Sequence, residues 1–500
     1  MHGPAFLPSA DDGLLVSFDS IGFDELHGLA SAVRAIEGVA ATITGHASLL
    51  VLARAPGAVA EVRREIESIL ARGIVPREAT SVDGHELDVD FSEEHAPDLP
   101  QLLAHAHISR DEFLSLIPSL ELRARYLGFL PGFAYLEGWP AEWSLPRRPV
   151  ARERVPAGSF GIAGSMAGFY AGASPGGWNI LGRTGATLWD PYADRPNRIA
   201  AGDLVRIRPG RFVSEDAAAR AGAPAGAEPV LAEILAPGLA TIVTGEASDE
   251  RLAFGLAPGG AFDAPAMRLA NRLVGNRDGA TLLECAGTGP RLRFACDATI
   301  AIVGAEAAVT LDGVRLSMRT MVAVGRGATL DAGVIRGGMR VVVAVRGGVA
   351  DPSPRWSARP HRLERGELLT CAGEEVLRRP LSPPQSGNRL ELAAFPGPHR
   401  IEARLLEHLF DREWTVTPSL DRTGVRLESG APPAALPALL PSCGMRFGSV
   451  QWHPGGELVV MGPDHPITGG YLQPLTVPRR ELWKIAQLVP GERVRFVMLR

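Results

Sequence analysis

The sequence has almost no lysine: Lys484 is the only one among 51 lysine and arginine residues. A P-loop requires Gly-Lys-Ser or Gly-Lys-Thr, and neither occurs here. Biotin is carried on a lysine that methionines normally flank, whereas Lys484 follows Trp483. We therefore expect no biotin on this chain. Any bound phosphate must be held by a metal ion, by backbone N–H groups, or by the planar, bidentate guanidinium of arginine.

Cysteine is also scarce, and long apolar runs are absent. The four cysteines are scattered and form no Cys-x-x-Cys pair, which is typical of a reduced, cytoplasmic protein. No apolar run approaches the roughly 20 residues that a membrane-spanning helix needs. The N-terminus lacks the basic and apolar regions of a signal peptide. We expect a cytoplasmic protein that does not contact a membrane.

The sequence has no excess of basic charge and few catalytic motifs. The formal net charge is −5, which argues against a nucleic-acid partner. His-Glu-x-x-His and Gly-x-Gly-x-x-Gly are absent, and the run at residues 172–176 that matches Gly-x-Ser-x-Gly lies among strands and turns, not in a strand–helix elbow, so a serine triad and a zincin site have no support. Residues 105–107 read His-Ala-His, but no carboxylate or cysteine stands at ligand spacing. We expect no protein-held metal there.

What is present divides the chain into four parts. Residues 10–80 alternate strand and helix patterns typical of a ferredoxin-like unit. Residues 85–210 are rich in strands, turns and glycine, and residues 211–229 are an Ala/Gly/Pro linker. Residues 230–500 form a second β-rich domain. The 46% hydrophobic content is ample for several cores.

An internal echo indicates a duplicated β unit. Residues 159–184 run Ser-Phe-Gly, then Ser-Pro-Gly-Gly-Trp, and end on Thr; residues 449–476 run Ser-Val-Gln, then Thr-Gly-Gly-Tyr, and end on Thr. Residues 202–206 are matched in the same way by residues 491–495. The echo predicts one strand-rich lobe per half, and spacing alone leaves a barrel and a sandwich equally admissible.

Glycine-rich motifs carry a family resemblance. Residues 128–133 (Gly-Phe-Leu-Pro-Gly-Phe), 155–164 and 174–184 resemble the KipI-like family, which includes the B-type component of bacterial 5-oxoprolinase. Residues 257–276 and 448–471 resemble the KipA-like family, which includes the C-type component of the same enzyme. Related modules form the carboxyltransferase domain of urea amidolyase. The chain thus resembles a natural B–C fusion.

The resemblance implies a fold that is mainly β with α+β: the ferredoxin-like unit plus two pseudo-symmetric, cyclophilin-like β-barrel lobes. It also implies a component of an ATP-dependent 5-oxoprolinase, with ATP and Mg²⁺ as cofactors and a separate A-type subunit as partner. Two alternatives stay open, a biotin-dependent carboxyltransferase of the urea type and a non-catalytic, kinase-inhibitor-like regulator. A homo-oligomer is also left open.

A shared pocket is predicted where the glycine loops of the two halves meet, because backbone N–H groups and arginine suit a small carboxylate or cyclic amide. Asp263 and Gln451 are the catalytic candidates. Asp263 also fits the N-cap of the helix that follows it, and Arg268 fits an ordinary surface position. The predicted binding residues are Gly128, Phe129, Pro131, Gly132, Phe133, Pro156, Gly158, Ser159, Gly161, Gly176, Gly177, Trp178, Arg183, Pro258, Gly259, Gly260, Arg268, Asn271, Gly469, Gly470 and Tyr471.

Several family loops are altered in this chain. The B-type proteins carry Tyr-Gly-Gly where residues 91–93 are Phe-Ser-Glu, and a polar loop after residue 349 is replaced by Pro-Ser-Pro-Arg-Trp at 352–356. The glycine-rich scaffold motifs of this chain thus match the family pattern better than its polar loops do. We expect a small ligand to bind, with slow turnover unless a partner subunit is present.

Overall fold

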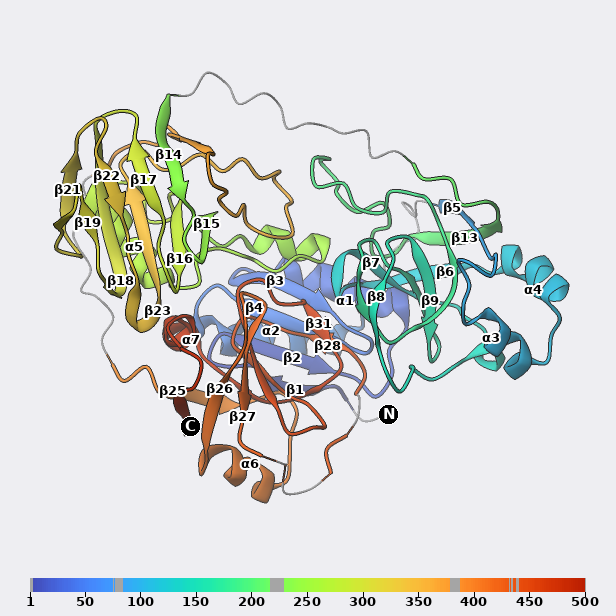
Figure 1. Cartoon of the computed structure of the whole chain (residues 1–500). Helices are drawn as coiled ribbons and strands as arrows, with labels where there is room; N and C mark the ends of the chain where they lie inside the picture. Colours follow the sequence, from blue (N-terminus) through green and yellow to red (C-terminus); the bar gives the residue numbers. More distant parts are fainter. Residues whose placement is uncertain are drawn as a thin grey trace.

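The computed structural model describes residues 3–74, 76, 84–215, 229–377, 387–430, 432, 435–437 and 440–499. Along the chain it has an α/β unit, a barrel, a β-sandwich and a second barrel (Figure 1). The fold is mainly β with two barrel-like sheets, as predicted. Most of the predicted linker, residues 216–228, lies outside the described residues.

The N-terminal unit is a four-stranded sheet with order β1-β2-β4-β3 and two helices on one face. The segment from β2 to α2 has the predicted ferredoxin-like sequence of elements. The fourth place in the sheet is taken by β1, which pairs antiparallel with β2. The elements are β1 (Ala5–Pro8), β2 (Gly13–Ser17), α1 (Phe23–Arg34), β3 (Val39–Thr44), β4 (Ser48–Ala53) and α2 (Val59–Arg72).

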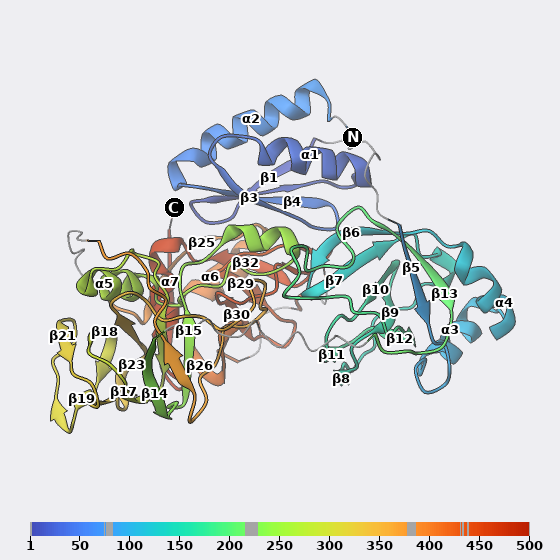
Figure 2. The same ribbon diagram turned by 90° about the horizontal axis from the view of Figure 1, so that it is seen from above.

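Both faces of this sheet are buried. Leu14 and Val16 of β2 pack against the helices, while Leu15 between them points to the opposite face. There Leu15 and Leu50 pack against Leu252 and other residues of the second half. The unit therefore lies across both halves with its helices outward (Figure 2).

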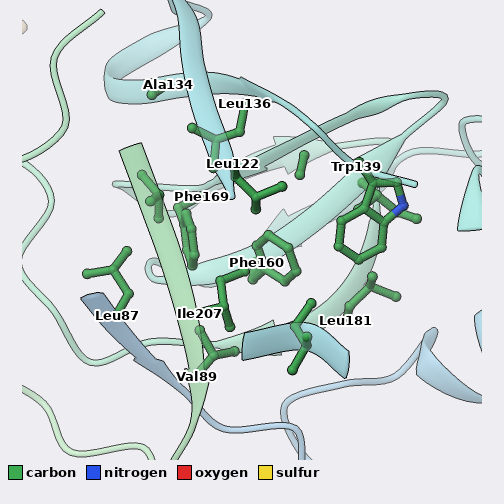
Figure 3. Close-up of a cluster of buried hydrophobic side chains, with 14 of the residues drawn as sticks. Leu87, Val89, Leu122, Ala134, Leu136, Trp139, Phe160, Phe169, Leu181 and Ile207 are labelled. Carbon is green, nitrogen blue, oxygen red and sulfur yellow. The ribbon is translucent and has the colours of Figure 1, made fainter. Parts of the chain in front are cut away.

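The first barrel is a seven-stranded sheet with order β12-β9-β10-β7-β6-β13-β5. Asp90 and Arg183 exchange both backbone hydrogen bonds, which joins the two edges and closes the sheet. Apolar side chains that include Phe160 and Phe169 fill its interior (Figure 3). Its strands are β5 (Gly84–Val89), β6 (Leu122–Gly128), β7 (Leu130–Glu137), β9 (Ser159–Ala163), β10 (Met166–Phe169), β12 (Asn179–Arg183) and β13 (Leu204–Pro209).

The second barrel repeats this topology strand for strand. Its order is β32-β29-β30-β27-β26-β33-β25, and it is closed. The parallel pair β5–β13 corresponds to the parallel pair β25–β33, so the echo in the sequence is a true structural duplication. The strands are β25 (Glu391–Pro396), β26 (Glu413–Leu420), β27 (Gly424–Glu428), β29 (Ser449–Trp452), β30 (Leu458–Met461), β32 (Leu472–Thr476) and β33 (Arg493–Met498).

Between the barrels the chain forms a β-sandwich, which the sequence pattern does not separate from the second barrel. A six-stranded sheet (β20-β19-β22-β17-β14-β24) and a five-stranded sheet (β15-β16-β23-β18-β21) enclose one apolar core. Helix α5 (Ala264–Val274) packs on the outer face of the five-stranded sheet. The strands are β14 (Val230–Ala236), β15 (Ala240–Thr244), β16 (Leu282–Ala286), β17 (Arg291–Phe294), β18 (Ala298–Ala307), β19 (Thr310–Leu311), β20 (Val314–Arg315), β21 (Met321–Val324), β22 (Thr329–Asp331), β23 (Ile335–Val345) and β24 (Leu368–Thr370).

Candidate functional site

The two halves meet at the tip of the β6–β7 hairpin, where the family motif begins. Gly128 lies so close to Thr468 that a Cβ at residue 128 would overlap the threonine hydroxyl. Phe129 has φ of 66°, a left-handed conformation that non-glycine residues rarely adopt. The structure thus brings a predicted loop of the first half against the loop that carries Gly469. A strained residue at this point is typical of a functional segment.

An aromatic cluster covers the outer face of the first barrel beside this contact. Phe133 makes edge-to-face contacts with Tyr135, Tyr170 and Trp178, with ring centroids 4.9 to 5.4 Å apart. Burial raises the pKa of Tyr126 and of Tyr170 to about 12. These phenols therefore stay protonated and able to donate hydrogen bonds at neutral pH.

Polar groups of the second half face this cluster. The Tyr126 hydroxyl lies near Ser442, and the Tyr135 hydroxyl lies near Thr468. The exposed Arg147 lies near both phenols. This boundary between the barrels carries buried tyrosine hydroxyls and the guanidinium of Arg147.

A cavity of about 130 Å³ adjoins the predicted loop at 258–260, and we call it the arginine-lined cavity. Arg251 there donates to the carbonyl oxygens of Ala257 (2.9 Å) and Ser357 (2.7 Å). Arg355 pairs with Glu250 at 3.0 Å, whereas Arg359 is exposed and has no carboxylate at ion-pair distance within the described residues. Four arginines line the cavity: Arg251, Arg355, Arg359 and Arg422.

A buried charge network runs from this cavity toward α5. Arg422 donates to both carboxylate oxygens of Asp464, at 2.7 and 3.0 Å, and to Glu284 at 2.8 Å. Glu284 also accepts from the backbone N–H of Phe262 at 2.6 Å. The network joins the sandwich to the second barrel through groups that satisfy one another, as buried charges require.

Asp263 directly follows Phe262, whose backbone N–H donates to Glu284. It caps the N-terminus of α5, as the sequence predicts. One carboxylate oxygen accepts from the Ala266 N–H at 3.0 Å, and the other from Gln487 Nε2 at 2.7 Å. Burial raises the pKa of Asp263 to about 6, and the nearby Glu284 adds to the rise. Asp263 is thus a carboxyl group that exchanges its proton close to neutral pH, which suits general acid–base chemistry.

The other predicted side chains lie apart from these cavities. Arg183 donates to the Ala157 carbonyl oxygen at 2.8 Å and stacks on Phe212, so its guanidinium already has partners at the barrel seam. Arg268 is exposed on α5, and Asn271 is buried and donates to the Ala280 carbonyl oxygen.

The predicted loop positions lie in five places. Gly128 and Gly132 belong to the β6–β7 hairpin, and Gly176, Gly177 and Trp178 lie by the aromatic cluster. The remaining first-half positions, Pro156, Gly158, Ser159 and Gly161, lie in or before β9. In the second half Pro258, Gly259 and Gly260 line the arginine-lined cavity. Gly469, Gly470 and Tyr471 lie before β32, where Tyr471 stacks on His453 and Gly469 lies against Gln451.

Several residues at the site carry no sequence signal. Arg422 stands in the turn between β26 and β27, and Gln487 directly follows α7 (Leu482–Ala486). Neither belongs to a motif, and each reaches the site through contacts more than 100 residues away in the chain. Within the described ranges, no group of three or more His, Cys, Asp or Glu side chains is placed to hold a metal ion.

Family models match both halves of the chain. Residues 4–199 match "Carboxyltransferase domain, subdomain C and D", and residues 254–498 match "Carboxyltransferase domain, subdomain A and B". The chain belongs to this carboxyltransferase-domain family. Its members include the B-type and C-type components of 5-oxoprolinase and urea amidolyase, and the order of the two matches agrees with a fused B–C protein.

Individual relatives match different parts of this family member. The B-type component of 5-oxoprolinase from Escherichia coli O157:H7 is 41% identical over 124 residues, 25% of this chain and 57% of that protein. The C-type component of 5-oxoprolinase from Haemophilus influenzae is 26% identical over 49% of this chain and 83% of that protein. The Saccharomyces cerevisiae urea amidolyase is 30% identical over 54% of this chain, which spans 17% of that protein.

The solved structure of TTHA0988 matches nearly the whole chain. It superposes with a TM-score of 0.82 at 28% sequence identity, covering 97% of this chain and 99% of that one. The arrangement of unit, barrel, sandwich and barrel therefore recurs in that solved structure. Among the described residues, no helix has the length and apolarity needed to span a membrane.

Proposed function

We propose that this chain is the combined B and C component of an ATP-dependent 5-oxoprolinase, which converts 5-oxoproline to glutamate together with a separate A-type subunit. One observation carries the proposal: a single chain holds a match to the B-type component and a match to the C-type component of that enzyme. The close approach of Gly128 to Thr468 supports it, because the two matched halves share a boundary lined by polar groups.

The reaction requires one site for the phosphates of ATP and one site for the carboxylate of 5-oxoproline. A lactam is a poor electrophile, and bound ATP would supply the phosphoryl group that makes its oxygen a leaving group. The arginine-lined cavity fits such a phosphate through Arg359, since Arg355 is paired with Glu250 and the chain has no lysine to offer there. Asp351 at its rim is the carboxylate that would meet Mg²⁺, which usually takes one or two carboxylates besides phosphate oxygens.

The first test is glutamate formation from 5-oxoproline with ATP and the cognate A-type subunit. We expect turnover to need all three components. Arg359→Gln should raise the KM for ATP about tenfold or more, because it removes a charge-assisted contact. Arg365→Gln, an exposed arginine outside the cavity, is the matched control and should change nothing. Failure of the complete mixture to form glutamate would refute the proposal.

A carboxyltransferase is the second candidate, because the yeast urea amidolyase matches 54% of this chain. Biotin would then be carried by another polypeptide. Carboxyl transfer from carboxybiotin to urea or another amide, without an A-type subunit, would establish this alternative instead.

A further inference from the structure

A second cavity, of about 240 Å³, opens at the N-terminal end of α5, between the sandwich and the second barrel. We call it the α5 cavity. It does not share its lining residues with the arginine-lined cavity. The residues that matter for its chemistry are Asp263, Leu269, Arg319, Arg389, Trp483 and Gln487.

The inner end of the α5 cavity presents a hydrogen-bond acceptor. Gln487 is fully engaged: its Oε1 accepts from the backbone N–H groups of Met339 and Arg340, and its Nε2 donates to Asp263 and to the Arg340 carbonyl oxygen. Each oxygen of Asp263 accepts one hydrogen bond from the protein. A carboxylate can accept about four, so Asp263 has acceptor capacity left for a ligand.

The outer end of the α5 cavity presents a cation. Arg389 lines the wall but is neutralised by a two-pronged pair with Glu492. Arg319 is exposed, and one guanidinium nitrogen donates to the Gly304 carbonyl oxygen at 3.1 Å. No carboxylate in the part of the chain that the structure describes lies within ion-pair distance of Arg319. Its backbone holds a left-handed φ of 59°, a strained conformation that surrounding contacts must maintain.

The wall between these two ends is apolar. Trp483 supplies a flat indole and Leu269 an aliphatic side chain, both facing the cavity. A compact ring or a short carbon chain would bury apolar surface against them. The cavity thus combines an acceptor, a cation and an apolar wall, in a volume suited to a molecule of amino-acid size.

We propose that the α5 cavity binds a small carboxylate that also carries an N–H donor. The carboxylate pairs with Arg319 at the mouth, and the N–H group donates to Asp263 at the inner end. A five-membered lactam acid and a free amino acid share this pattern. Naming 5-oxoproline and glutamate as the ligands rests on the proposed function, whereas the recognition chemistry stands on the cavity itself.

Calorimetry on the full chain without ATP or a partner subunit tests the proposal through four ligands. We expect 5-oxoproline or L-glutamate to bind, and the two titrations show which form the cavity prefers. Cyclopentanecarboxylate lacks the N–H donor and 2-pyrrolidinone lacks the carboxylate, so each should bind at least tenfold more weakly than 5-oxoproline. These analogues probe Asp263 without a substitution in the capped helix.

The variants Arg319→Gln and Arg326→Gln locate the site. Arg319→Gln should lower the affinity for the carboxylate-bearing ligand at least tenfold and leave the affinity for 2-pyrrolidinone unchanged. Arg326, an exposed arginine of the sandwich outside the cavity, is the matched control. Equal affinities in wild type and Arg319→Gln, or no binding of either acid at millimolar concentration, would overturn the proposal. If the complete enzyme turns over 5-oxoproline but calorimetry detects no binding at the α5 cavity, this site is refuted and the proposed function stands.

Discussion

Asp263 shows how a single residue serves two purposes. As the N-cap it stabilises the first turn of α5, and as a buried acid it has a pKa raised to about 6. Because the folded chain binds this proton more tightly than the unfolded chain, the group contributes stability at low pH. That contribution is lost as the pH rises through the folded pKa of about 6.

The free energy of unfolding should therefore show the Asp263 titration. Between about pH 4.5 and pH 7.5 the Asp263 contribution should fall by roughly 2 kcal/mol. In Asp263→Asn this part of the pH dependence should vanish, whatever the variant's absolute stability. Urea unfolding at both pH values measures it, with the exposed Asp194→Asn as control. An identical pH slope in wild type and Asp263→Asn would refute the raised pKa.

At the scale of elements, the β6–β7 hairpin is built to touch the other half. Its tip needs Gly128, both for φ of 145° and because the Thr468 side chain occupies the space that a Cβ would take. This explains why the glycine-rich motif is more than a tight turn: the absent side chain lets two loops approach closely.

We expect Gly128→Ala to destabilise the chain by about 1–3 kcal/mol through overpacking and backbone strain. Thr468→Ala should recover part of this loss, because it removes the clashing hydroxyl but not the strain. A double-mutant cycle from denaturant unfolding measures the coupling between residues 128 and 468. Additive effects within about 0.3 kcal/mol would show that the two loops do not touch.

At the scale of the whole molecule, the N-terminal unit holds the two halves together. Asp12 is buried and pairs with Arg446 and Arg479 of the second barrel. On the other side, Arg125 of the first barrel donates to the carbonyl oxygens of His46 (2.7 Å) and Ile21 (2.8 Å). One small unit thus contacts both barrels, which match separate polypeptides among the 5-oxoprolinase relatives.

Cutting the chain between residues 215 and 229 with an engineered protease site should therefore leave the halves associated. Asp12→Ala should weaken this association by about 3 kcal/mol or more, because it leaves the charge of the buried Arg446 without its carboxylate partner. Size-exclusion chromatography of the cut protein measures the effect, and Asp19→Ala, at an exposed position of the same unit, serves as control. Separation of the halves after cleavage of the otherwise wild-type chain would contradict this account.

Much of the fold was predictable from local pattern and from the internal echo. The start of α5 follows from its cap residue, Asp263. The duplicated barrel strands follow from the echo. The sandwich between the barrels was not separated, because its short strands repeat the same alternating pattern and nothing local marks where one core ends.

The sequence by itself determined the family and the duplicated β architecture. Those properties depend on residue identity and short-range spacing. Tertiary structure alone decided that the Arg183 guanidinium bonds to the Ala157 carbonyl oxygen where the first barrel closes. It also decided that Arg422 reaches Glu284 and that Gln487 reaches Asp263. Finally, it left Arg319 without a carboxylate partner among the described residues. These outcomes depend on contacts between residues far apart in the chain, where burial and charge pairing are set by the packed molecule and leave no mark on the local sequence.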